Sequence, residues 1–502
     1  MLWSGPMRAG LRPWIVALTA LVVVCVRFDL VPLLRGPAPY PPEWQWRHRP
    51  RALSRALPAV PAGVALAGLL AWSGSRAARR RPRRSAAVVI AGGLVVGGLL
   101  PLLLLASEDG GCVAHLVRRT ASPGYLSYHA VASSEAAADV GRFLRDYPRL
   151  VPELPVHAAT HPPGPVLVFR GLIAVLEDVP WLQRALDARV RAACGDEADG
   201  CGPYLAAQGG APRAAALAGA LIAHGLTVAT LLPIAWLAFQ LTRDPLAAAR
   251  TAALWPLVPG AALFLPALDG AIAFPVACAL AGWRAACAAE RAWARAAGVV
   301  AAAAMGAAAA YLSYGSGLFL ILGAGVVLAS LPAAVWTSPR RRVLGPLAAV
   351  AALGTAFLLA PLALGHDPLA SARAALALHT TEFTALRSYG TWLVFGPLDF
   401  AMFLGVPVAV AFAAHAWQGT RWATAAPPAR FALATALVLA ALFASGLVRG
   451  EVGRLFVPLL PLGLIAGVLR LDDEPGPDAG TAATFALLLV AVDAVLRLNW
   501  RI

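Results

Sequence analysis

Two neighbouring carboxylates, Glu108 and Asp109, follow directly after a long apolar run and precede Gly110 and Gly111. A carboxylate there can act as a general base toward a hydroxyl group held within hydrogen-bonding distance. Glycines let the backbone approach a ligand closely, which favours a binding role for this turn. The alternative is that two polar residues simply end a membrane span.

The polar stretch that begins at Ser107 closes on His161, Pro162, Pro163 and Gly164. Consecutive prolines cannot continue a helix, and they stiffen the chain into an extended segment. They therefore fix the position of His161 where the next apolar run begins. His161 is a candidate substrate-binding residue, and a bystander at a proline-rich helix start is the alternative.

Further charged side chains stand at the ends of later apolar runs. Asp269 precedes Gly270, which suits either a turn or an ionisable group that faces the protein interior. Arg449, Glu451 and Arg454 form a charged turn between two late runs. An arginine there can hold a phosphate through paired hydrogen bonds and stabilise a leaving phosphate, or it can grip lipid headgroups.

Tyr125, Tyr128 and His129 lie in the middle of the same long polar stretch. Aromatic faces can pack on the CH groups of a sugar, so these residues are candidates for a sugar site. Aromatic side chains also anchor proteins at membrane interfaces, which is the alternative interpretation.

The elements that must position these residues are apolar helices. The chain has 502 residues, of which 59% are hydrophobic and 13% charged, whereas about 25% are charged in a typical soluble domain. Uncharged runs of about 17 to 25 residues, the length of a membrane-crossing helix, recur along the chain. A water-soluble enzyme is excluded, and we expect an all-α polytopic transmembrane helix bundle of about 12 to 14 spans.

The distribution of arginine predicts the orientation. All 41 basic residues are arginine, the net charge is +15, and residues 76–84 form an arginine-rich loop after the second apolar run. Because such loops stay in the cytoplasm, the third span, residues 85–106, emerges on the outside. The loop 107–165 is then extracytoplasmic, and its apolar spacing over 133–147 predicts a helix on the membrane surface. We expect a multi-pass protein of the bacterial plasma membrane with no nucleic-acid partner.

Cys194 and Cys201 bracket a short polar stretch, and the six cysteines form no CxxC pair. The absence of that pair argues against a zinc or redox motif. In an oxidising compartment the two cysteines can form a disulfide, and two free thiols are the alternative.

Together, Glu108-Asp109 and His161-Pro162-Pro163-Gly164 resemble motifs of the C-type (GT-C) superfamily of membrane glycosyltransferases. This superfamily includes the protein O-mannosyltransferases and the lipid A aminoarabinose transferases. In its members, a span delivers an acidic pair to a long first extracytoplasmic loop, which ends in a His-Pro-Pro or Lys-Pro-Pro motif. Asp269 and the turn of Arg449 to Arg454 are also similar to features of the superfamily. The chain departs from the pattern at Gly164, where many members have leucine, and in having Glu-Asp as its acidic pair.

The resemblance implies an inverting glycosyltransferase that uses a polyprenyl-phosphate sugar donor and an envelope glycan, lipid or protein acceptor. It implies Asp109 as the base, with Glu108 orienting it or helping to bind a cation. A divalent cation, Mg or Mn, at Glu108 and Asp269 is left open. The substrate-binding residues that the resemblance implies are His161, Asp269, Arg449, Glu451 and Arg454, and His129 and Tyr128 join them as the aromatic candidates named above.

The same resemblance divides the chain into three parts. Residues 1–84 form an additional transmembrane hairpin with the arginine-rich cytoplasmic loop. Residues 85–470 form the catalytic module, and residues 471–502 contain an acidic loop and a last span.

Two other functions are open, a transporter or flippase of lipid-linked sugars and a non-catalytic membrane subunit. A transporter places its ionisable residues near the middle of the bilayer, whereas the acidic residues here cluster at the ends of spans.

Overall fold

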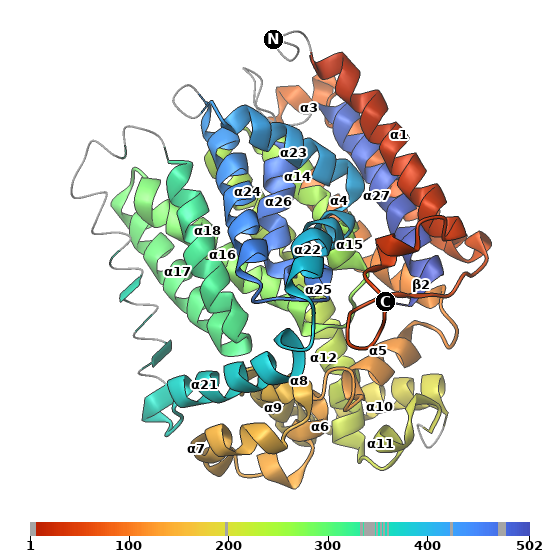
Figure 1. Ribbon diagram of the computed structural model, residues 1–502, viewed down its shortest axis with the longest axis vertical. Coiled ribbons are helices and arrows are strands. Elements are labelled where there is room, and N and C mark those ends of the chain that lie inside the picture. Colours follow the sequence, from red (N-terminus) through yellow and green to blue (C-terminus); the bar gives the residue numbers. More distant parts are fainter. Residues whose placement is uncertain are drawn as a thin grey trace.

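The computed structural model describes residues 7–195, 199–331, 361–421, 425–469 and 478–501, with a few single positions between 332 and 360. These residues form helices almost throughout, and their one sheet has two short strands (Figure 1). The predicted all-α helix bundle is confirmed at this level. The acidic loop predicted after residue 471 lies outside the described residues up to 477.

Seven described helical segments are long and apolar enough to cross a membrane. They are Leu53–Trp72 (η2, Leu53–Ala59, with α2, Val60–Trp72), Pro82–Ala106 (α4), Gly210–Thr242 (α12, Gly210–Ala229, with α13, Leu231–Thr242), Leu268–Ala288 (α16), Ala292–Leu312 (α17), Pro427–Ser445 (α24) and Ala479–Asn499 (α27). An eighth candidate is the pair α22 (Tyr389–Leu404) and α23 (Val406–Gly419), which bends by 116° around Gly405. The φ of Gly405 is +92°, a conformation that favours glycine. α1 (Met7–Phe28) carries the first apolar run and packs beside α27.

This count is lower than the predicted 12 to 14 spans, because several apolar runs are too short or are broken. A membrane crossing needs about 20 residues. Three of the apolar runs that were expected to be spans form helices shorter than that. They are α9 (Gly164–Asp178), α18 (Tyr314–Ala329) and α26 (Leu460–Val468). The run 251–267 breaks at Pro256 and Pro259 into α14 (Pro245–Ala253), η6 (Trp255–Leu257) and α15 (Pro259–Ala262), since proline interrupts helices. The run 343–364 lies largely outside the described residues.

Short helices gather at one end of the bundle, below the long helices in Figure 1. Those of the loop after α4 are α5 (Cys112–Ala121), α6 (Tyr128–Ala132), η3 (Glu135–Ala137), α7 (Val140–Leu150), η4 (Val151–Glu153) and α8 (Val156–Ala159). They lie with α10 (Pro180–Cys194), η5 (Asp199–Cys201), α11 (Pro203–Ala206), α21 (Pro368–His379) and η7 (Thr380–Thr384). The arginine-rich α3 (Arg76–Arg80) lies at the opposite end (Figure 1), as the predicted orientation requires.

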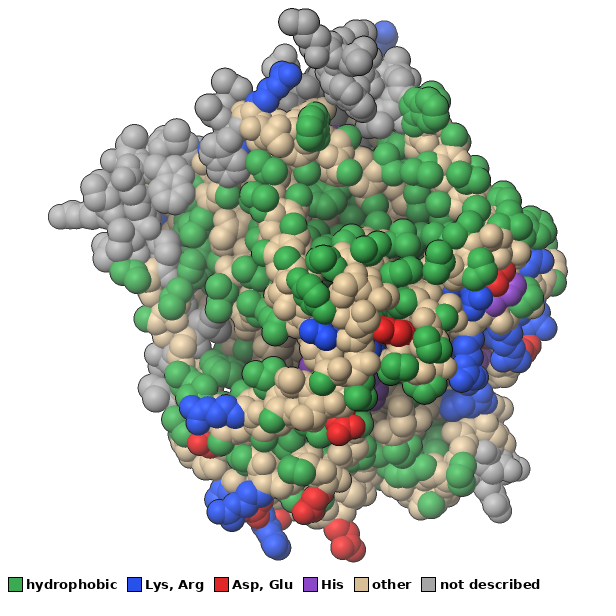
Figure 2. Space-filling view, viewed as in Figure 1, with side chains coloured by type: hydrophobic (Ala, Val, Ile, Leu, Met, Phe, Trp, Pro, Cys, Tyr) green, Lys and Arg blue, Asp and Glu red, His purple; other side chains and the backbone are tan. Residues whose placement is uncertain are grey.

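The helix predicted over 133–147 begins later, at Val140. Asp139 caps it by accepting a hydrogen bond from the amide of Arg142. Hydrophobic side chains cover the face over the long helices, and charged ones gather over the short helices and beside β2 (Figure 2). An apolar belt with charged residues beyond its end is the surface of a protein that sits in a bilayer.

Two distant segments of the chain meet in a short ladder. β1 (Arg47–His48) follows η1 (Pro32–Arg35) and pairs antiparallel with β2 (Trp500–Arg501), with Arg47 opposite Arg501. The pairing continues as the amide of Arg49 donates to Asn499 O at 2.7 Å and that of Arg51 to Leu498 O at 2.8 Å. The ladder thus joins the segment before α2 to the end of α27, beside the acidic pair.

Cys194 and Cys201 form a disulfide, the first of the two alternatives open from the sequence. Both cysteines are buried against Ala114 and Val117 of α5. Arg118 of α5 also donates a hydrogen bond to Gly200 O at 3.0 Å. The disulfide loop therefore helps to hold α5 in place.

Gly164 begins α9 where this helix meets α17. A Cβ atom at Gly164 would collide with the backbone oxygen of Tyr311 in α17. This close approach explains why the position requires glycine.

We expect Gly164→Ala to destabilise the protein by about 1 to 3 kcal/mol, because backbone cannot yield as a side chain can. The matched control is Gly171→Ala on the same helix, where a Cβ would meet open space. The measurement is the thermal unfolding midpoint of each purified variant in one detergent. Equal midpoints for the two variants would contradict the proposed packing.

Candidate functional site

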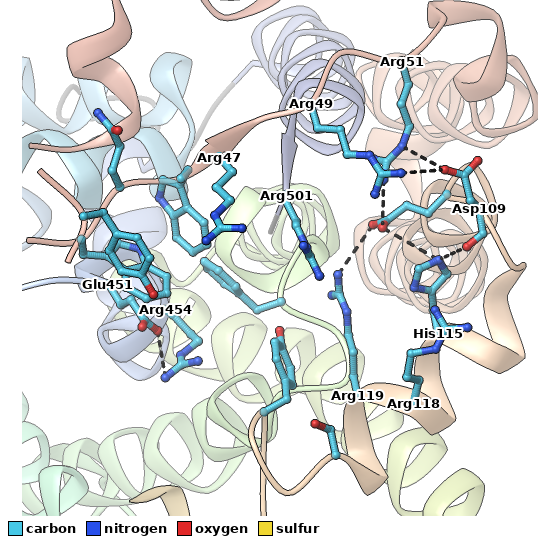
Figure 3. A pocket seen from close by; sticks show the side chains of 18 residues that line it. Arg47, Arg49, Arg51, Asp109, His115, Arg118, Arg119, Glu451, Arg454 and Arg501 are labelled. Carbon is cyan, nitrogen blue, oxygen red and sulfur yellow. Dashed lines mark hydrogen bonds and ion pairs between the residues drawn. The ribbon is translucent and has the colours of Figure 1, made fainter. Parts of the chain in front are cut away.

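A cavity of about 660 Å³ opens where α4 ends (Figure 3). Its walls come from the N-terminal strap (residues 40–51), the turn after α4 with α5, the turn into α25 (Val452–Leu455), and β2. Seven arginines and three carboxylates are among its lining residues. The described walls therefore carry a surplus of positive charge, which suits an anionic ligand.

Glu108 is the buried carboxylate of the cavity wall, with a side chain only 8% exposed. Arg497 donates to its Oε1 at 2.7 Å, and Arg51, Arg119 and His115 lie within 4 Å of its oxygens. Burial raises the pKa of Glu108, but Arg497, Arg119 and His115 outweigh this effect and bring it below the usual 4.5. Glu108 is therefore an ionised anchor that already has several partners.

Asp109 is the exposed carboxylate, with a side chain 56% accessible. Arg55 donates to its Oδ1 at 2.6 Å, and Arg49 and Arg51 lie 3.5 and 3.9 Å from its Oδ2. The hydrogen bond from Arg55 is the main reason that the pKa of Asp109 lies below its usual 3.8. Asp109 is thus ionised at neutral pH and faces the open cavity, so it can meet an incoming hydroxyl group.

His115 connects the acidic turn to α5. Its Nε2 donates to the backbone oxygen of Asp109 at 2.6 Å. Burial lowers the pKa of His115, and the nearby charge of Glu108 only partly opposes this effect. His115 is therefore neutral at pH 7 and adds no charge to the cavity.

Across the cavity from Asp109, Glu451 and Arg454 form the other wall (Figure 3). Arg454 lies 2.9 Å from an oxygen of Glu451 and 3.8 Å from one of Asp269. Its guanidinium group thus sits between two carboxylates, and its charge is already balanced. Glu451 has a φ of +50°, a costly conformation for a residue other than glycine that clusters at functional sites.

His161 and Tyr128 support the wall that carries Arg454, although neither lines the cavity. The Nδ1 of His161 donates to His157 O at 3.0 Å, and the Tyr147 hydroxyl donates to His161 O at 2.8 Å. The rings of Tyr128 and His161 meet edge to face at 5.4 Å. Burial lowers the pKa of His161, against the opposing charge of Asp269. The His-Pro-Pro motif is thereby held as a neutral, hydrogen-bonded turn.

His129 and Arg449, two predicted substrate-binding residues, lie away from the cavity lining. His129 is fully buried and its Nε2 donates to Pro212 O at 2.8 Å. Arg449 donates to the carbonyl oxygens of Thr384 and Arg387 at 2.9 and 2.8 Å. These hydrogen bonds are contacts within the fold, and the Nδ1 of His129 is buried without a hydrogen-bond partner among the described residues.

The predicted cation ligands, Glu108 and Asp269, do not come together as a metal site. Each has an arginine as its neighbour, Arg497 for the first and Arg454 for the second. Within the described ranges, no group of three or more His, Cys, Asp or Glu could hold a metal ion. This donor set does not fit a divalent cation, which prefers several oxygen ligands.

Aromatic rings complete the cavity between its two charged sides. Trp44 and Trp46 meet edge to face at 5.5 Å, and Trp46 lies 5.8 Å from Phe264. The guanidinium group of Arg119 lies over the ring of Tyr125 at 5.5 Å. Such rings offer flat apolar surfaces to the CH faces of a sugar or to an isoprenoid chain.

Sequence reasoning missed most of the cavity arginines. Arg47, Arg49 and Arg51 alternate along the strap, and alternate residues of an extended segment point to one side. This alternation in the sequence could have identified the three arginines as one group. Arg497 and Arg501 gave no such signal, because they stand at the end of an apolar run where basic residues commonly end a span.

Comparison of the chain with protein-family models, curated proteins and solved structures finds no match.

We expect Glu108→Gln to destabilise the protein by about 3 to 5 kcal/mol, because it leaves a buried cation without its counter-charge. That cation is Arg497, whose side chain is 0% exposed. Asp109→Asn is the control and should leave the thermal midpoint almost unchanged, since Asp109 is exposed. If both variants unfold at the same temperature, Glu108 is not the anchor.

The same ion pairs predict a response to acid. Because the pKa of folded Glu108 lies below 4.5, its stabilising effect is complete above that pH and is lost as the pH falls through the folded-state value. We expect the thermal midpoint of the wild type to fall more steeply than that of Glu108→Gln between about pH 5 and about pH 3. Parallel curves would contradict this assignment.

Proposed function

We propose that the protein is a membrane glycosyltransferase that moves a sugar from a polyprenyl-phosphate donor to an envelope glycan, lipid or protein. The observation that supports this best is the cavity at the end of α4, where an exposed carboxylate meets a surplus of arginine. A transferase of this class needs a base for the acceptor and positive charge for the leaving phosphate.

Asp109 is the proposed base. Its carboxylate is ionised and accessible from the cavity, whereas Glu108 is buried among its cationic partners. Asp109 takes the proton of the acceptor hydroxyl as the acceptor oxygen bonds to the anomeric carbon. The bond from that carbon to the phosphate oxygen breaks with inversion, and its electron pair stays on the phosphate.

The leaving phosphate belongs on the arginine-rich side of the cavity. Breaking the glycosyl bond turns a singly charged phosphodiester into a phosphomonoester that carries up to two charges. Arg454 is a poor partner for this growing charge, because Glu451 and Asp269 already balance it. Glu451 and the aromatic wall are better suited to hold the sugar, through its hydroxyl groups and its CH face.

A transporter of lipid-linked sugars is the second candidate, and Asp493 favours it. This aspartate is fully buried in α27, and neither of its oxygens has a hydrogen-bond partner among the described residues. Ionisable groups within a span commonly mark a transport path. The transferase is preferred because the larger group of charges lines the cavity at the end of the spans.

The test is sugar transfer by purified protein from radiolabelled polyprenyl-phosphate sugars to an envelope extract. We expect Asp109→Asn to reduce the rate by about 10²-fold or more, because general bases contribute about 10² to 10⁴-fold. Asp146→Asn, another exposed aspartate outside the cavity lining, is the matched control and should keep full activity.

Equal transfer by wild type and Asp109→Asn would remove Asp109 as the base. If no donor gives transfer, and labelled lipid crosses vesicle bilayers in a manner that Asp493→Asn abolishes, the transporter replaces the transferase.

A further inference from the structure

The ladder between β1 and β2 places two arginines at one position of the cavity wall. Arg47 and Arg501 are cross-strand partners, and both line the cavity. Trp46 and Trp500, their neighbours in the chain, are buried and anchor the two strands. The ladder is therefore a fixed support for two exposed guanidinium groups.

The side chains of these two arginines differ from those of Arg49 and Arg51 in having no hydrogen-bond or ion-pair partner among the described residues. Arg49 and Arg51 lie within 4 Å of Asp109, whereas neither Arg47 nor Arg501 has a side-chain hydrogen bond or ion pair with a described residue. Like charges directly opposite each other on a ladder are destabilising. An anion held between the two side chains would remove this repulsion.

The side chains of Arg47 and Arg501 reach from the ladder into the cavity, and Arg119 rises toward Arg501 from the opposite wall (Figure 3). Arg119 pairs with Glu108, so this carboxylate partly balances its charge. Arg118, which also lines the cavity without a described carboxylate partner, donates a hydrogen bond to a backbone oxygen at 3.0 Å. The two ladder arginines are thus the lining arginines whose side chains have neither a carboxylate nor a hydrogen-bond acceptor among the described residues.

We propose that Arg47 and Arg501 form a clamp for a doubly charged phosphate group, a phosphomonoester in preference to a phosphodiester. Two guanidinium groups offer paired hydrogen bonds to phosphate oxygens. A phosphomonoester presents three terminal oxygens and up to two charges, enough for both arginines. A phosphodiester has two such oxygens and only one charge, so it can balance the charge of only one of them.

Only the role of the clamp in the reaction rests on the proposed function. There, it binds the polyprenyl monophosphate product more tightly than the phosphodiester donor, so its hold strengthens as the glycosyl bond breaks. Interactions that strengthen toward the transition state accelerate the chemical step. The binding preference itself can be measured without any sugar transfer.

The experiment is equilibrium binding of radiolabelled farnesyl phosphate to the purified full-length protein in a non-ionic detergent at pH 7.5. The competitors are farnesyl methyl phosphate, farnesol and inorganic phosphate. We expect the wild type to bind farnesyl phosphate at least about tenfold more tightly than its methyl ester. The variant with Arg47→Ala and Arg501→Ala should lose this preference.

The matched control replaces Arg184 and Arg189 with alanine, since both are exposed arginines of α10 outside the cavity lining. It should keep the preference of the wild type. Replacing Arg47 and Arg501 with lysine keeps the charges without the planar forks and should give an intermediate preference. Thermal midpoints of all variants show whether each one is folded.

Equal affinity for the monoester and the methyl ester in the wild type overturns the clamp. So does a preference that survives in the double alanine variant. If inorganic phosphate competes as strongly as unlabelled farnesyl phosphate does, the clamp is supported and its ligand is free phosphate. An intact preference without any sugar transfer rejects the proposed function and leaves the clamp standing.

Discussion

The buried ion pair between Glu108 and Arg497 holds together segments that are 389 residues apart in the chain. Around the same carboxylate lie Arg51 of the N-terminal strap and Arg119 of α5. One carboxylate therefore fixes the ends of α4 and α27, the strap and the first helix of the long loop. The cavity lies where these four parts meet, and the strap, the turn after α4, α5 and the strand β2 after α27 supply lining residues.

The adjacent carboxylates Glu108 and Asp109 have different roles because their burial differs. Glu108 is removed from water, so several cations are needed to keep it ionised. Asp109 remains exposed and keeps a face open to the cavity. Arg51 lies within 4 Å of both, so the exposed carboxylate is positioned by the partners of the buried one. Of these two adjacent carboxylates, one thus anchors the fold and the other stays open to the cavity.

Much of the fold could be predicted from the sequence, because apolar composition and arginine position are local properties. The all-α class, α4 and the long loop after it followed from them. The number of spans could not be predicted in the same way. Hydropathy measures how apolar a run is, whereas a membrane crossing also requires an unbroken helix of about 20 residues. The run 251–267 is apolar throughout, yet its prolines divide it into short helices. Similarly, the requirement for glycine at position 164 follows only from the position of Tyr311.

The candidate site was predictable only where its residues form local motifs. Glu108, Asp109, Glu451 and Arg454 were found in this way, and all four line the cavity. His129 and Arg449 looked equally suitable, but the Nε2 of His129 and the guanidinium group of Arg449 donate to backbone oxygens away from the cavity. The strap arginines could be grouped by their alternation in the sequence, whereas the place of Arg501 beside Arg47 follows only from the tertiary pairing of the two strands.

The carboxylates and the arginines of the cavity come from different parts of the chain. Residues 85–470 contribute to the cavity all three of its carboxylates, but only three of its seven arginines, Arg118, Arg119 and Arg454. Two of these three have carboxylate neighbours from the same region. Most of the positive surplus thus comes from the strap and β2, which meet through the ladder. The segments outside residues 85–470 are therefore the ones that make the cavity suitable for an anion.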